Sequence, residues 1–205
     1  MAKPPIYTIG HSTHPIDYFL ELLLHNGVNC VVDVRSLAAS RFNPQYNKKA
    51  LVVSLNVHNV EYLHLPQEFG ARQTDPAFLD AEGRVDFLKL RASDKFKDGV
   101  RRLSSRVENY TIALMCSEAD PLRCHRFGMI APALNDFDVR HILKDKSILS
   151  QHDLEMKLLQ YYLKKRQPSL FEAPSTEMEM LLDAYRMLNR EIAYSPAEHK
   201  RNFKK

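Results

Sequence analysis

Residues 110–126 read YTIALMCSEADPLRCHR, in which an apolar run passes directly into a segment crowded with reactive side chains. The apolar run, residues 110–115, has the composition of a buried β-strand. Asp120 and Pro121 are a strong helix-start signal, because Asp caps helix N-termini and Pro is favoured in the first turn. The segment therefore predicts a strand, a reactive loop and a helix that Pro132 should kink or end.

Four other short apolar runs accompany this strand within the first 150 residues. They cover residues 6–9, 30–34, 61–65 and 139–143. Helical patterns separate them, and strand–helix–strand units of this kind build parallel sheets with right-handed crossovers. We therefore predict an α/β fold, with a five-stranded, mainly parallel sheet and helices on both faces.

Two further helices are predicted at the C-terminal end of the chain, at about residues 151–165 and 176–193. A Pro-containing joint, residues 167–175, separates them. A chain of 205 residues suits one domain with a full core, alone or with a small appendage. We expect residues 1–150 to form the α/β core domain, and residues 151–205 to form a helical extension packed on it.

The charge balance is mildly basic, with 29 Lys and Arg residues against 25 Asp and Glu residues. A net charge of +4 permits an anionic partner, either a small molecule or a nucleic acid, without requiring one. The positive charges are dispersed along the chain. Only residues 199–205 form a basic run, and a short run of this kind is most often a solvated tail.

The cysteine content and the lack of long apolar runs indicate a cytoplasmic protein. Three cysteines are an odd number and do not make a disulfide framework, so a reducing compartment suits them. The N-terminal residues lack the apolar stretch of a signal peptide, and no run approaches the ~18 apolar residues that span a bilayer. We expect no membrane partner. The residues specify neither a cofactor nor an oligomeric state.

Ligands of parallel α/β sheets bind outside the carboxyl ends of the strands. This rule selects the residues that follow the predicted strands, together with arginines in the loops beyond them. Because the strands share one direction, we expect the residues at their ends to line one depression. Several arginines and a helix start favour an anionic ligand there. The residues selected to bind substrate are Gly10, His11, Ser12, Asp33, Arg35, Arg41, Arg72, Cys124 and Arg126.

Three further residues at this edge are candidates for catalysis: Cys116, Glu118 and His125. A cysteine between a strand and a helix can act as a nucleophile, because the helix dipole and nearby arginines lower its pKa. Glu118 can act as a general acid or base if a pocket raises its pKa. Two of these residues and two of the arginines have structural alternatives. Cys116 could be a small core residue, Glu118 a capping carboxylate, and Arg35 and Arg126 partners of nearby acids.

Zinc binding and disulfide formation are weaker interpretations of the same residues. Cys116, Cys124 and His125 could form a zinc tetrahedron with His11 or His64. Seven residues between the cysteines is not a recognised zinc spacing, and His125 beside Cys124 should point elsewhere on the helix. No metal ligand is therefore assigned. A disulfide between Cys116 and Cys124 would need their Cα atoms within ~7 Å.

Eight short segments together carry a resemblance to a known family. They are TIGHS at 8–12, VVDVR at 31–35, SRFNPQ at 40–45, ALMCSE at 113–118, DP at 120–121, CHR at 124–126, HIL at 141–143 and EIAY at 191–194. This combination resembles the bacterial and archaeal family called domain of unknown function 488, over nearly the whole chain. Ala38 and Ala39 replace a proline and an aromatic residue, Ala71 replaces a glycine, and Ser117 takes a usual alanine position. The resemblance implies the fold and the place of the site, and it names no reaction.

The residues favour an enzyme that acts on a phosphorylated or nucleic-acid-derived substrate at the strand ends. One alternative is a non-catalytic nucleic-acid-binding protein that uses the arginines and the basic tail. A further alternative is a structural or protein-interaction role, which would be marked by an exposed apolar face on the two C-terminal helices.

Overall fold

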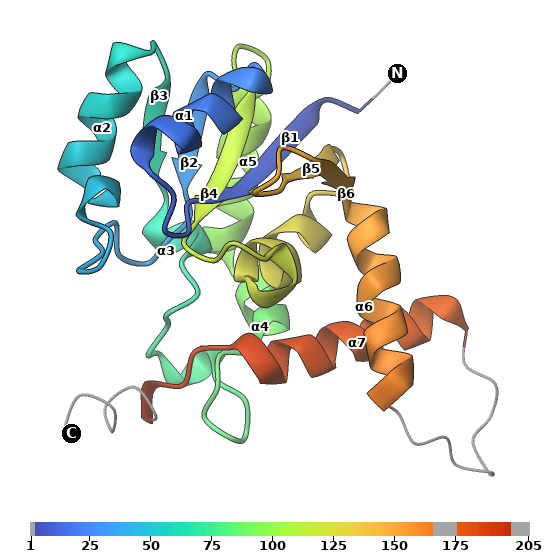
Figure 1. The fold of residues 1–205 in the computed structure, drawn as a ribbon. Helices are drawn as coiled ribbons and strands as arrows, with labels where there is room; N and C mark the ends of the chain where they lie inside the picture. Colours follow the sequence, from blue (N-terminus) through green and yellow to red (C-terminus); the bar gives the residue numbers. More distant parts are fainter. Residues whose placement is uncertain (1–2, 166–175, 198–205) are drawn as a thin grey trace, which may run out of the picture.

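The computed structural model describes residues 3–165 and 176–197 and has a central sheet flanked by helices (Figure 1). The strands are β1 (Pro5–Gly10), β2 (Cys30–Asp33), β3 (Glu61–His64), β4 (Ile112–Cys116), β5 (Asp138–Ile142) and β6 (Ile148–Ser150). They lie in the order β3-β2-β4-β1-β5-β6. All neighbouring pairs are parallel except β5 and β6. The predicted α/β class with a mainly parallel sheet is confirmed.

The predicted number of strands, five, is wrong by one. The additional strand, β6, has only three residues and lies at the edge of the sheet, antiparallel to β5. A polar turn joins the two strands, and Lys146 in that turn has a left-handed φ of 70°. A strand this short is too brief to show the alternating pattern by which strands are recognised in a sequence.

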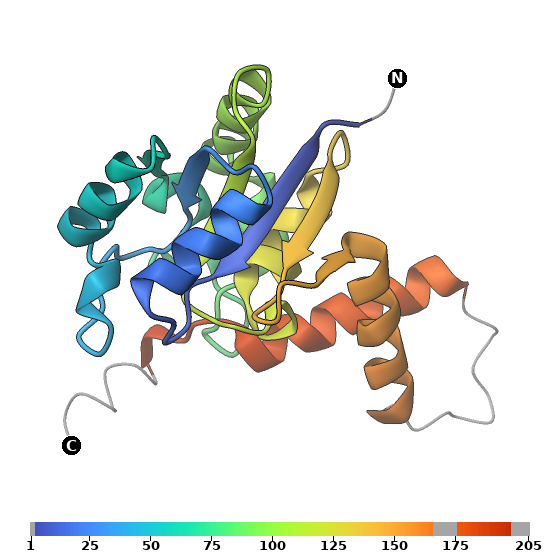
Figure 2. The same ribbon diagram turned by 45° about the horizontal axis from the view of Figure 1, so that its top comes forward.

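Helices cover both faces of the sheet, as predicted. They are α1 (Ile16–His25), α2 (Lys48–Val57), α3 (Pro66–Phe69), α4 (Phe87–Ala92), α5 (Asp94–Arg106), α6 (Gln151–Lys165) and α7 (Glu177–Ile192). Alternate residues of β4 divide between two apolar clusters. Ala113 and Met115 join the cluster formed with α1 and α2, whereas Leu114 and Cys116 join the one formed with α3 and α5. Figures 1 and 2 show α1 and α5 on opposite sides of the strands.

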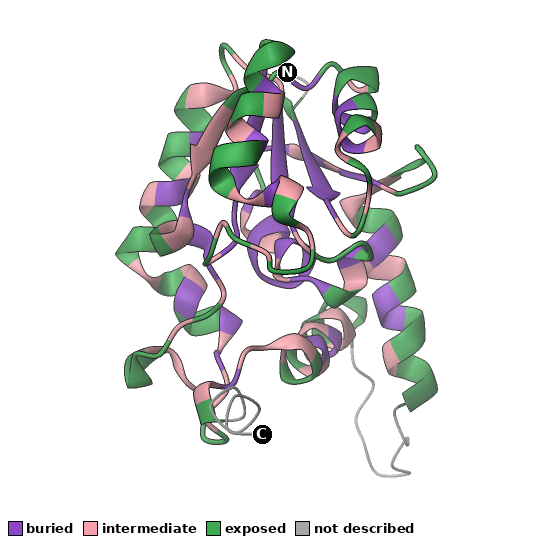
Figure 3. Cartoon of the chain, turned by 60° about the vertical axis from the view of Figure 1, so that its left-hand side comes forward, coloured by how far each residue is buried: buried purple, intermediate pink, exposed green. Residues whose placement is uncertain are grey.

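The register of the three central strands gathers the expected site residues at one edge. Gly10, at the end of β1, is paired with Cys116 at the end of β4. On the other side of β4, Asp33 of β2 is paired with Met115. All of these residues are buried, and Figure 3 shows the buried colour concentrated in the strands. The loops after β1, β2 and β4 therefore leave the sheet side by side.

The two C-terminal helices pack on the rest of the described structure through a third apolar cluster. Phe127 meets Leu154 and Leu158 of α6 and Ala184 and Leu188 of α7. A capping box at Thr176 and Glu179 begins α7. This helix crosses the lower part of Figure 1, so that its C-terminal end approaches the edge where β4 ends. The predicted joint, 167–175, and the basic run, 199–205, lie outside the described residues.

The long helix predicted after Asp120 is not formed. A single 3-10 turn, Pro121–Arg123, begins where expected, and the Asp120 side chain accepts a hydrogen bond from the Leu122 amide at 2.9 Å. Cys124 is then extended, and a π-helical turn, Arg126–Ile130, and another 3-10 turn, Ala131–Ala133, follow it. Because Cys124 interrupts the helical backbone, the segment has no long helix whose N-terminus could hold an anion.

Candidate functional site

Four reactive side chains meet beyond the end of β4: Cys116, Glu118, Cys124 and His125, which we call the Cys–Glu–His cluster. The thiols of Cys116 and Cys124 both donate to Oε2 of Glu118, at 2.8 and 3.1 Å. Nδ1 of His125 lies 3.6 Å from the Cys116 sulfur and 3.9 Å from the Cys124 sulfur. One donor atom from each of the four residues lies within 4.8 Å of all the others.

Local backbone geometry brings Cys124 and His125 to the same point. Cys124 is extended, with φ −135° and ψ 142°, whereas His125 is helical, with φ −62° and ψ −20°. This change of conformation between adjacent residues lets both side chains reach Cys116. The expectation that His125 would point away from the cysteines is therefore wrong. It assumed a continuous helix, in which neighbouring side chains diverge by about 100°.

Burial and charge distribute protons unequally within the cluster. All three cysteines of the chain are free thiols, and Cys116 and Cys124 are buried. Burial, with the hydrogen bond to Cys124, raises the pKa of the Cys116 thiol well above its usual value. Burial also acts to raise the pKa of Cys124, but the polar influence of the adjacent Cys116 thiol and the positive charge of Arg126 outweigh it and lower that pKa. Cys124 is thus the sulfur that holds negative charge more readily.

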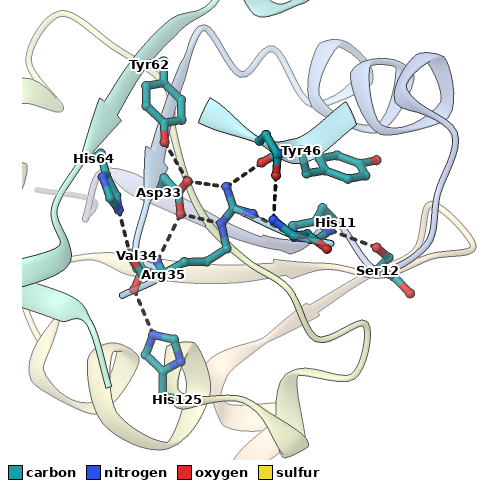
Figure 4. A network of polar contacts seen from close by, with 11 residues as sticks. His11, Ser12, Asp33, Val34, Arg35, Tyr46, Tyr62, His64 and His125 are labelled. Atoms are coloured by element: carbon teal, nitrogen blue, oxygen red, sulfur yellow. Dashed lines mark hydrogen bonds and ion pairs between the residues drawn. The ribbon is translucent and has the colours of Figure 1, made fainter. Parts of the chain in front are cut away.

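The acid and the imidazole of the cluster respond to the same charge. Glu118 is an exposed residue whose carboxylate accepts from the two buried thiols, and burial of the carboxylate together with the charge of Cys124 raises its pKa. Burial opposes a charge on His125, yet the adjacent Cys124 and Glu118 raise its pKa overall. Nε2 of His125 lies 3.1 Å from the Val34 carbonyl oxygen (Figure 4). A carbonyl can only accept, so in the neutral ring the proton sits on Nε2 and Nδ1 faces the sulfurs unprotonated.

A buried ion pair holds the loop that follows β2 (Figure 4). Arg35 donates to both carboxylate oxygens of Asp33, at 2.9 and 2.6 Å, and to the Tyr46 carbonyl at 2.9 Å. Tyr62 donates its hydroxyl to the same carboxylate at 2.7 Å. His11 lies beside this pair, with Nε2 3.2 Å from Nη1 of Arg35.

His11 is held uncharged in this network. A guanidinium can only donate, so Nε2 of His11 accepts from Arg35 and Nδ1 donates to the Ser12 carbonyl at 2.8 Å. Burial lowers the pKa of His11 to about 4, despite the hydrogen bond to Ser12, which favours the charged form. The neutral ring stacks on Tyr46 with centroids 4.1 Å apart. Asp33, Arg35 and His11 are therefore hydrogen-bonded to one another and to neighbouring groups, as in a structural network.

Arg126 fixes the loop that carries Glu118. Its side chain is fully buried and donates to the carbonyl oxygens of Glu118 and Ala119, at 2.6 and 3.0 Å. Its Nε atom has no hydrogen-bond partner among the described residues. Gly10 lies under the same loop, where a Cβ would meet the Glu118 carbonyl oxygen at 1.8 Å. The close approach of the loop to β1 therefore requires glycine at position 10.

The Cys–Glu–His cluster forms the base of an open cleft of about 280 Å³. One wall is the loop after β2, another is the segment after α3, and the end of α7 supplies the third. Arg72 and Arg123 lie at the rim, and neither guanidinium has an acidic partner within the described part of the chain. The Arg72 guanidinium lies 5.9 Å from the centre of the Tyr194 ring. The lining residues are Arg35, Ser36, Leu37, Ala39, Ala71, Arg72, Cys116, Ser117, Glu118, Arg123, Cys124, His125, Ile192 and Tyr194.

A family model described as "Domain of unknown function DUF488" matches residues 15–131, more than half of the chain. The chain belongs to this family. No curated protein and no solved structure matches it. The DUF488 match contains the whole Cys–Glu–His cluster, whereas β1 precedes the match and α6 and α7 follow it. Across the described ranges, the structure has no helix with the length and apolar character that a membrane crossing needs.

The candidate residues of this DUF488 protein fall into three groups. Arg35, Arg72, Cys116, Glu118, Cys124 and His125 line the cleft. Gly10, His11, Ser12, Asp33 and Arg126 lie beneath or beside it and hold its loops. Arg41 is exposed and does not line the cleft. Sequence reasoning did not select Arg123 or Tyr194 for the site. Arg123 lies within the reactive segment, but Tyr194 is remote in sequence and reaches the cleft only because α7 packs there.

Proposed function

We propose that this DUF488 protein is an enzyme that binds a small phosphorylated or nucleic-acid-derived substrate over the Cys–Glu–His cluster. The observation that carries the proposal is the position of the cluster at the base of an open cleft, with Arg72 and Arg123 at its rim and no acidic partner for either among the described residues. Reactive groups and binding groups in one cleft are the usual arrangement of an active site. Within the cluster, the catalytic side chains are Cys116, Glu118 and His125.

The rim arginines supply the recognition of an anion. The guanidinium groups of Arg72 and Arg123 face the cleft from two different segments, so an anion between them can accept hydrogen bonds from both. Arg35 and Arg126 act differently in this proposal. Arg35 is occupied by Asp33, and Arg126 by two carbonyl groups. They position the loops of the site and do not contact the substrate.

The size of the cleft supports an enzyme over a nucleic-acid-binding protein. A volume of about 280 Å³ suits a phosphate-bearing small molecule or a single nucleotide unit. A non-specific nucleic-acid-binding protein instead needs basic side chains along an extended face. The buried thiols also have no use in contacts with a phosphate backbone, whereas they suit a reaction centre.

The test is isothermal titration calorimetry with pyrophosphate, a nucleoside monophosphate and oligonucleotides of increasing length. Arg72→Ala and Arg123→Ala should each weaken binding of the small anion by about 1.5–3 kcal/mol, or about tenfold to a hundredfold. Arg101→Ala is the matched control, because Arg101 is exposed on α5, forms an ion pair with Asp98 and does not line the cleft. The bound ligands are then followed for conversion, which Glu118→Gln should abolish.

Two results would count against the proposal. The first is unchanged anion affinity in both rim variants while circular dichroism shows an intact fold. The second is affinity that rises with oligonucleotide length, falls steeply with salt and is accompanied by no conversion. That pattern would identify a nucleic-acid-binding protein.

A further inference from the structure

We propose that the Cys–Glu–His cluster is a metal site that binds one Zn²⁺ ion through the Cys116 and Cys124 sulfurs, Nδ1 of His125 and the Glu118 carboxylate. This inference goes beyond the proposed function and does not rest on it, because metal binding needs no substrate. The donors come from one short segment, residues 116–125, and converge only because of the turn between them.

The spacing of the donors fits a tetrahedral ion. Bond lengths of about 2.0–2.3 Å to nitrogen and sulfur place those two atoms about 3.5 Å apart around zinc. The His125 nitrogen lies 3.6 and 3.9 Å from the two sulfurs, so little movement is needed. The Glu118 oxygen lies closer to the sulfurs, at 2.8 and 3.1 Å, because shared protons join these atoms. An ion in place of those protons would move the oxygen outward, toward the open cleft.

The surroundings of the cluster already hold two donors in a ligating orientation. Nε2–H of His125 donates to the Val34 carbonyl, so that the Nδ1 lone pair points at the sulfurs. Histidine ligands of metals are usually fixed by such a partner on the other ring nitrogen. The backbone amide of Arg126 points to the Cys124 sulfur at 3.5 Å. Both contacts come from groups outside the cluster.

The charge around the site independently indicates an anionic cluster. Arg126 is fully buried, yet within the described ranges it has carbonyl partners and no carboxylate partner. A buried cation without a counter-charge is costly, so negative charge is expected beside it. Two thiolates and the Glu118 carboxylate together supply three negative charges. A divalent ion and Arg126 neutralise them.

The donor set favours zinc, as an ion that accepts sulfur and nitrogen ligands, over Mg²⁺ and Ca²⁺. Thiolate sulfur and imidazole nitrogen suit Zn²⁺, whereas Mg²⁺ and Ca²⁺ take oxygen donors. Binding requires both sulfurs as thiolates, so any remaining thiol proton passes to the buffer as the metal–sulfur bond forms. No oxidation occurs in this step. Glu118 is the exposed member of the set and therefore the ligand that a substrate or water in the cleft can displace.

The experiment uses the full chain, reduced and stripped of metal with a chelator, then incubated with Zn²⁺ and passed through a desalting column. Elemental mass spectrometry should find one equivalent of zinc per chain. Cys116→Ser and Cys124→Ser should lose stoichiometric binding. Cys30→Ser should retain it, because Cys30 is an equally buried cysteine in β2, outside the cluster. Circular dichroism checks the fold of each variant.

A second measurement covers variants that fail to fold. Co²⁺ bound to the wild-type chain should show the strong near-ultraviolet absorption of thiolate-to-cobalt charge transfer. Absence of retained zinc in the wild type, absence of that absorption, or full zinc retention in folded Cys116→Ser would each overturn the inference. Arg72→Ala should bind zinc as the wild type does. A failure of anion binding and a failure of metal binding are therefore separate results.

Discussion

A β-carbon at Gly10 would lie 1.8 Å from the carbonyl oxygen of Glu118 and 2.7 Å from its carbonyl carbon. Both are backbone atoms, so no side-chain rotation can relieve the overlap. The loop that carries Glu118 therefore rests directly on the end of β1. Arg126 donates to the same carbonyl oxygen, so two contacts fix the backbone that carries the Glu118 carboxylate.

Gly10→Ala should displace this loop. We expect the free energy of unfolding to fall by about 1–3 kcal/mol, the usual cost of overpacking, and zinc affinity to fall as Glu118 leaves the sulfurs. Denaturant titration and zinc retention measure the two effects. Gly27→Ala is the control, since Gly27 has φ 65° but nothing within 4 Å of its added carbon. Gly27→Ala should lower the free energy of unfolding through backbone strain alone. If Gly10→Ala binds zinc with wild-type affinity, the contact between Gly10 and the Glu118 loop does not position the carboxylate.

Arg35→Met should be among the most destabilising substitutions near the site. It leaves Asp33 charged and fully buried, which we expect to cost about 3–5 kcal/mol. The double variant Arg35→Met/Asp33→Asn should recover part of that loss, because the uncompensated charge is gone. A double-mutant cycle from chemical denaturation measures the coupling. Strictly additive effects would show that the two residues do not form an ion pair in solution.

Stability should decrease as the pH falls below about 6.5, because His141 is buried without charge. Its ring lies between Thr8 and Gln151, and burial lowers its pKa from 6.5 to about 4. Between these values the unfolded chain binds a proton that the folded chain does not, so the free energy of unfolding falls with pH. The decrease in the free energy of unfolding that is due to His141 approaches about 3 kcal/mol at pH 4. Above pH 6.5 His141 contributes no pH dependence.

Variants separate this contribution from that of other groups. His141→Gln should flatten the decline in the free energy of unfolding between pH 6.5 and 4, measured by denaturation at a series of pH values. About half of the combined decline should remain, because burial lowers the pKa of His11 from 6.5 to about 4 as well. His152→Gln is the control, since His152 is exposed on α6. An identical slope in the wild type and His141→Gln would exclude His141 as a source.

Leu188→Ala should show how tightly α7 is joined to the core. Leu188 is buried, and its Cδ2 would lie 3.2 Å from a Cβ at Gly128. We expect the free energy of unfolding to fall by about 2–5 kcal/mol, because the substitution opens a cavity beside Phe127. Unfolding should still show a single transition, since α7 and the core share this apolar cluster. Leu182→Ala, on the exposed side of α7, should cost far less. Two separate transitions would indicate that residues 151–205 unfold independently of the core.

Several features of this protein were predictable from local sequence pattern. The apolar run that becomes β4 and the α6 and α7 periodicities are properties of consecutive residues, so each was recognisable without a structure. The strand-end rule also placed Cys116 and Gly10 at one edge, because parallel strands share a direction. β6 was not predicted, because three residues are too few to show an alternating hydrophobic pattern. The length of the helix after Asp120 was overestimated. Asp120 and Pro121 do begin a helical turn, but the extended backbone at Cys124 ends it.

The sequence by itself thus determined the fold class, and it indicated the sheet edge beside the candidate cleft and six of the residues that line this cleft. Tertiary structure alone decided which of those residues meet. The pairing of Arg35 with Asp33 and of Arg126 with carbonyl groups depends on burial, which makes an unpaired charge or polar group costly and so assigns each arginine its partner. The convergence of His125 with two thiols depends on one extended residue, and the wall at Tyr194 depends on how α7 packs. The wall at Tyr194 joins segments far apart in sequence. The other contacts join residues at most nine positions apart, which meet because of backbone turns and burial that a hydrophobic pattern does not record.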